Sequence, residues 1–133
     1  MDTLTRDKAR IEETTDTTSK VVETCSINDA WRQGDIEIRF LGCEKPRFEL
    51  VKTKRPKQLA PGTTKGSRHG LKGRQIKAYQ LTDANPLEGP VLHCPNGLTV
   101  PHPEHGDITL KEPGWYVITY QRAFAEELKR QED

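Results

Sequence analysis

Short runs of β-favouring residues, each ended by a turn signal, constrain the fold of this chain most. Apolar and charged residues alternate strictly over residues 36–40, which is the pattern of a strand with one buried face. Residues 115–121 favour strand throughout and are apolar on both faces, which predicts a central strand. With the weaker runs between them, the pattern predicts a mainly β fold, a small antiparallel barrel or sandwich.

The composition divides the chain into three parts. Apolar residues make up 32% of the 133 residues and charged residues 31%, a lean balance for one packed domain. Residues 1–26 are rich in threonine and charge, which predicts a flexible, disordered N-terminal arm. We expect a β-rich domain over 27–122. Residues 123–133 are expected to form a short C-terminal helix and tail, with Phe124 and Leu128 on one face.

Targeting signals and disulfide patterns are both missing from the sequence. No apolar run approaches the roughly 18 residues of a membrane-spanning helix, and the first residues lack the apolar stretch of a signal peptide. We therefore expect a cytoplasmic protein with no membrane partner. Cys25, Cys43 and Cys94 form no C-x-x-C pair, so we expect reduced thiols and no zinc finger.

Basic residues are concentrated in one segment. Residues 45–74 carry ten basic side chains and one acid, Glu49, whereas 75–133 carry nine acids and five bases. Such a block favours contact with phosphate, although a solvated loop is the alternative. One or two of Tyr79, Tyr116 and Tyr120 could stack on bases. The predicted contacts to RNA or single-stranded nucleic acid are Lys52, Lys54, Arg55, Lys57, Lys65, Lys72 and Arg74.

Three histidines form the candidate chemical site. His102 and His105 lie three apart in a turn where prolines flank His102, and His69 lies in a glycine-rich loop. Metal binding would need three ligands on converging loops, and the H-x-x-H spacing lacks the metalloprotease pattern, so we expect no metal and no cofactor. The other interpretation is acid–base cleavage of RNA. The predicted catalytic residues are His69, His102, His105 and Arg68.

These motifs occur together in a familiar layout. The chain combines the loop at 66–69, His102-Pro103-Glu104-His105, and Pro113-Gly114-Trp115-Tyr116 running into Gln121-Arg122. Over residues 34–122 it resembles a loose group of small, uncharacterised bacterial and phage β-rich proteins with an H-x-E-H…P-G-x-Y…Q-R pattern. The resemblance implies that these residues form one unit, and it implies no reaction.

Two functions therefore stay open. The first is a β domain that engages RNA or single-stranded nucleic acid, with a histidine cluster that binds phosphate or acts as a ribonuclease or phosphodiesterase. The second is an accessory subunit of a larger bacterial or phage assembly, without catalysis, whose partners bind the N-terminal arm or the C-terminal helix. Histidine rings that meet in the open beside the basic loop would favour the first function, and rings stacked into the core would favour the second.

Overall fold

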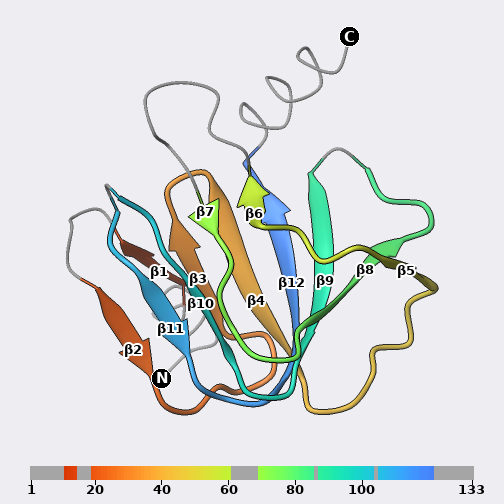
Figure 1. Cartoon of the computed structure of the whole chain (residues 1–133), viewed down its shortest axis with the longest axis horizontal. Helices are drawn as coiled ribbons and strands as arrows, with labels where there is room; N and C mark the ends of the chain where they lie inside the picture. The colour runs from red at the N-terminus through yellow and green to blue at the C-terminus, as the bar shows by residue number, and fades with distance from the viewer. Residues whose placement is uncertain (1–10, 15–18, 61–68, 86, 104, 122–133) are drawn as a thin grey trace, which may run out of the picture.

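The computed structural model describes residues 11–14, 19–60, 69–85, 87–103 and 105–121. These residues form twelve strands in three sheets (Figure 1). In chain order the strands are β1 (Ile11–Thr14), β2 (Lys20–Val22), β3 (Ala30–Gln33), β4 (Ile36–Gly42), β5 (Leu50–Thr53), β6 (Gln58–Ala60), β7 (His69–Gly70), β8 (Lys77–Leu81), β9 (Glu88–Cys94), β10 (Leu98–Val100), β11 (Ile108–Leu110) and β12 (Gly114–Tyr120).

The main sheet contains seven strands in the order β1-β3-β4-β12-β9-β8-β5. β12 lies between β4 and β9 and is antiparallel to both, with Tyr116 opposite Phe40 on one side and Leu92 on the other. The prediction of a central strand at 115–121 is therefore confirmed. Neither β4 nor β9 is adjacent to β12 in the sequence, so β12 joins the strands on its two sides into one sheet.

A second layer covers one face of the main sheet. It consists of a three-stranded sheet, β10-β11-β2, and the β6–β7 pair, which lie in front of the main sheet in Figure 1. Ile38, Leu92 and Tyr116 of the main sheet belong to one core cluster with Val100 and Ile108 of the three-stranded sheet, and all five are fully buried. Burying each aliphatic side chain of this kind contributes about 1.5–3 kcal/mol, so the contact between layers stabilises the fold.

The chain is mainly β, but the predicted architecture is wrong in several respects. The main sheet is open, with β1 and β5 at its edges, so it is not a closed barrel. Two pairings, β1 with β3 and β11 with β2, are parallel. The arm expected to be disordered contributes β1 and β2 to the sheets, because backbone pairing does not need an apolar sequence pattern.

No helix occurs among the described residues, and the helix predicted for 123–133 lies outside them. Within the described part of the chain, no helix has the length and apolar character needed to cross a membrane.

Candidate functional site

The structure brings three histidines from two segments together. His69 lies on β7, while His102 and His105 lie in the turn between β10 and β11. The ring centroids of His69 and His102 are 4.5 Å apart, and those of His102 and His105 are 4.6 Å apart. We call these three residues the histidine cluster. Its rings are tilted against one another by 51° and 46°, so they pack as a continuous group.

Gln33, at the end of β3, fixes the innermost ring. This fully buried side chain donates from Nε2 to the carbonyl oxygens of Val100, at 2.8 Å, and Gly106, at 2.7 Å. Its Oε1 lies 2.8 Å from His69 Nδ1. An amide oxygen only accepts hydrogen bonds, so the network assigns the proton of the neutral His69 ring to Nδ1. We call Gln33 and these three partners the Gln33 joint.

The turn that carries the other two histidines is closed by its own polar groups. The backbone N–H of His102 donates to Asp107 Oδ1 at 3.2 Å, and that of His105 donates to His102 Nδ1 at 3.0 Å. Gly34 lies against this turn with a φ of +57°, and a Cβ atom there would be 2.9 Å from the His105 ring. The close approach therefore requires glycine.

Burial decides what the cluster can do chemically. His69 is 1% exposed and His102 is 3% exposed, while His105 is half-buried. Burial, with the neighbouring His102 and His105 rings, lowers the pKa of His69 to about 3, so this ring is neutral at pH 7. Within the described residues, no group of three histidine, cysteine or acidic side chains could hold a metal ion. This geometry gives His69 a structural role.

The catalytic role of the cluster stays a prediction. His102 is as enclosed as His69, so a substrate phosphate would reach only His105 without a rearrangement. Arg68, the expected cationic partner, lies outside the described residues.

Those predicted nucleic-acid contacts that the structure describes lie in two segments of the chain. Lys52, Lys54 and Lys57 are exposed on β5 and the segment after it, and Lys72 and Arg74 are exposed after β7. Lys65 lies outside the described residues. Arg55 differs from the others because its guanidinium donates to two carbonyls, Gly73 O at 2.9 Å and Leu71 O at 3.4 Å. Arg55 thus links the segment after β5 to the segment after β7.

The face of the main sheet opposite the second layer carries a feature that sequence analysis missed. His93 and Trp115 are directly paired across β9 and β12, and their rings stack at 4.5 Å with an interplanar angle of 27°. Tyr79 on β8 also approaches Trp115, with the two ring centroids 5.4 Å apart. We call Tyr79, Trp115 and His93 the aromatic ladder, and this side of the sheet the outer face. The other two tyrosines point to the core side, Tyr116 fully buried and Tyr120 donating to Leu59 O.

Exposed lysines lie beside the aromatic ladder. A hollow of about 480 Å³ on the outer face is lined by His93, Gln75, Ile76, Lys77 and Pro95. A second hollow, of about 310 Å³, is lined by Tyr79 and Lys54 but also by Leu59 and Tyr120, so it opens on the side of the second layer. Lys77 is paired across the strands with His93, and Lys52 with Tyr79. Two lysines thus flank the ladder in register.

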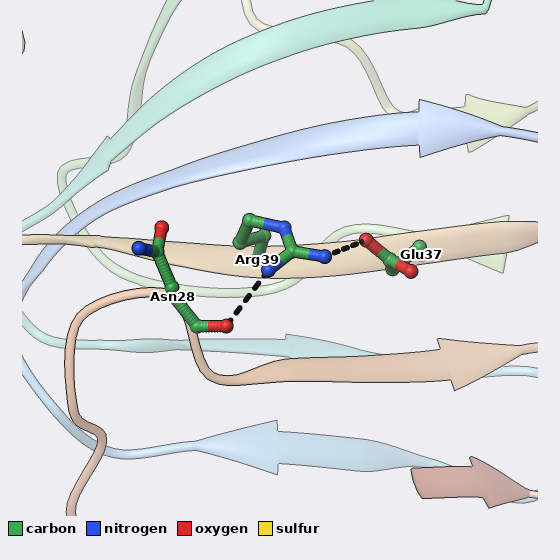
Figure 2. Close-up of polar contacts among 3 residues, drawn as sticks. All are labelled: Asn28, Glu37 and Arg39. Carbon is green, nitrogen blue, oxygen red and sulfur yellow. Dashed lines mark hydrogen bonds and ion pairs between the residues drawn. The ribbon is translucent and has the colours of Figure 1, made fainter. Parts of the chain in front are cut away.

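The far side of the outer face differs in charge. Arg39 on β4 lies opposite Val117 of β12 and binds two oxygens, Glu37 Oε1 at 2.8 Å and Asn28 O at 2.8 Å (Figure 2). Its charge is therefore matched locally. Lys52 and Lys77 form no ion pair with any residue that the structure describes. These two lysines thus place unmatched positive charge at the β5 and β8 side of this face.

Comparison with known proteins identifies the domain but assigns no chemistry to it. The family model of a domain of unknown function, DUF8820, matches residues 32–121, which is more than half of the chain and includes the histidine cluster and the aromatic ladder. No curated protein and no solved structure matches the chain. By the extent of the family match, the chain belongs to the DUF8820 family.

Proposed function

We propose that this domain binds single-stranded nucleic acid, RNA or DNA, across the outer face of its main sheet. One observation carries the proposal: on the outer face, exposed Lys52 and Lys77 are paired across the strands with Tyr79 and His93 of the aromatic ladder, beside a hollow lined by His93 and Lys77. Flat rings provide sequence-tolerant stacking, and lysines attract the phosphates between stacked bases. A predicted signal, the basic segment at 45–74, supplies Lys52 to this face.

The dimensions of the ladder fit a short single strand. The two ring-to-ring distances place the Tyr79 and His93 centroids at most about 10 Å apart. Stacked nucleotides rise by about 3.4 Å each, so the ladder spans at most about three nucleotides. Trp115 is only 6% exposed, and its ring packs against both of the other rings. We infer that bases stack on the half-buried rings of His93 and Tyr79.

The proposal is for binding and does not extend to cleavage. Acid–base catalysis needs two groups within reach of a substrate, and two of the three cluster rings are buried. The accessory-subunit function is the competing proposal. Its expected contact segments are the N-terminal arm, whose described parts pair within the sheets, and the C-terminal helix, which lies outside the described residues. The burial of His69 and His102 favours this second function, whereas the lysines and rings of the outer face favour nucleic-acid binding.

Titration of a fluorescently labelled 12-nucleotide single strand by the protein tests the proposal. Two lysine contacts, from Lys52 and Lys77, predict that log K falls with log salt with a slope of about −1.4, since each phosphate contact on a single strand contributes about −0.7. Lys77→Ala should lower the magnitude of this slope by about 0.7. Lys111→Ala is the matched control, because Lys111 lies on the other layer beside Glu23 and should leave the slope unchanged.

A second variant separates stacking from charge. His93→Ala should weaken binding by about 1–3 kcal/mol, the usual contribution of one stacked base, and leave the salt slope unchanged. Quenching of tryptophan emission on binding would place the bound nucleic acid near the aromatic ladder. Absence of binding at low salt, or equal behaviour of the Lys77 and Lys111 variants, would overturn the proposal.

A further inference from the structure

The Gln33 joint attaches a small part of the second layer to the main sheet. β7 is only two residues long, and its Gly70 N–H donates to Pro101 O at 3.1 Å. The Gln33 side chain extends from the end of β3 and reaches both β7, through His69, and the segment from Val100 to Gly106. One side chain of the main sheet thus holds β7 and the 101–107 turn in place.

The joint requires a proton on His69 Nδ1, and the burial of Nε2 disfavours the second proton that would charge the ring. Both hydrogen bonds from Gln33 Nε2 end on carbonyls, so Oε1 must receive the His69 Nδ1 proton. Among the described residues, buried His69 Nε2 has no hydrogen-bond partner. A second proton on this ring would be placed on Nε2, beside the rings of His102 and His105 and without an acidic partner in the described part of the chain. Such a buried, unpaired charge is strongly disfavoured.

We propose that the Gln33 joint is a pH-sensitive lock, which holds β7 and the 101–107 turn closed while His69 is neutral and lets both open locally in acid. The titratable groups that border His69 among the described residues are His102 and His105. Asp107 is the charged group that fixes the turn itself, because its carboxylate accepts the His102 N–H.

The direction and size of the effect follow from the two states of His69. In the open state the ring titrates near its ordinary value of 6.5, whereas closure lowers the pKa to about 3. Between these values the open state binds more protons, so each unit of acidification favours opening about tenfold. From pH 7.5 to pH 4.5, His69 alone raises the open population about 90-fold.

Hydrogen exchange read by mass spectrometry tests the lock, after correction for the pH dependence of intrinsic exchange. In the peptides that cover 69–72 and 100–107, the open population read from exchange should be about 90-fold larger at pH 4.5 than at pH 7.5, by the linkage above. Peptides from β4 and β12 should change by less than about threefold, because they lie outside the joint. An equal change everywhere would mean global acid destabilisation and would overturn the proposal, as would no change in the two lock peptides.

A matched pair of variants isolates the titrating group. His69→Asn keeps an amide donor for Gln33 but cannot titrate, so the extra opening in acid should fall below about threefold. His93→Asn removes a histidine from the outer face and should keep the wild-type pH response. If His69→Asn does not fold, ¹⁵N shifts of the wild-type His69 ring replace it. An unchanged Nδ1–H tautomer from pH 7.5 to 4.5 in the closed form supports the lock, and titration near 6.5 in the folded protein refutes it.

Discussion

Replacing Gln33 by methionine tests how much of the stability depends on one buried polar side chain. Methionine has a similar length, so the change removes hydrogen bonds with little change in volume. It leaves three groups without their partner: the carbonyls of Val100 and Gly106 and the Nδ1–H of His69. A buried polar group left unpaired costs about 1–3 kcal/mol. Allowing for some relaxation, we expect a loss of about 3–6 kcal/mol.

Such a loss is a large share of the stability of a small domain, which is typically about 5–15 kcal/mol. Urea unfolding followed by tryptophan fluorescence and by far-ultraviolet circular dichroism measures it. Gln80→Met is the matched control, because Gln80 is exposed on β8 and should change the unfolding free energy by less than about 0.5 kcal/mol. A loss below about 1 kcal/mol in Gln33→Met would show that these partners find other hydrogen bonds, and the reasoning about the joint would fail.

Two further predictions concern close packing and thiol chemistry. Gly34→Ala should cost about 1–3 kcal/mol in urea unfolding, because φ is +57° and the new Cβ would lie 2.9 Å from the His105 ring. In a His105→Ala background the loss should shrink, and an equal loss in both backgrounds would contradict the steric part. With Ellman's reagent at pH 8, exposed Cys43 should react before Cys25 and Cys94, whose burial raises their pKa values to about 11 and about 12. Reaction of Cys94 first would contradict the buried core.

Elements with a strong side-chain pattern could be predicted from sequence. The alternation at 36–40 corresponds to β4, whose residues are alternately buried and half-buried, and the apolar run at 115–121 corresponds to the central β12. β2 could not be found in this way, because its residues are half-buried or exposed and its place depends on backbone pairing with β11. Parallel pairing joins distant segments and leaves no local signal in the sequence.

The same distinction explains the outcome for the candidate site. The H-x-x-H turn and the glycine-rich loop identified His69, His102 and His105, but a motif does not report burial, so the sequence predicted solvent-facing chemistry. The aromatic ladder carries a weaker signal. Tyr79 and His93 lie on two different strands, and only the register of β8, β9 and β12 brings their rings to Trp115.

His93 and the histidine cluster lie in two different environments, and each environment favours a different role for the ring. His93 is half-buried on the outer face and is paired across the strands with Lys77. At this position its ring can stack on a ligand, and the charge of the exposed lysine is solvated. His69 lies between the layers, where Gln33 requires a proton on Nδ1 and burial disfavours a second proton on Nε2. Because the two rings lie on opposite sides of the main sheet, acid should open the lock without removing the ladder. Nucleic-acid binding and local opening are therefore separable properties, and each has its own histidine variant.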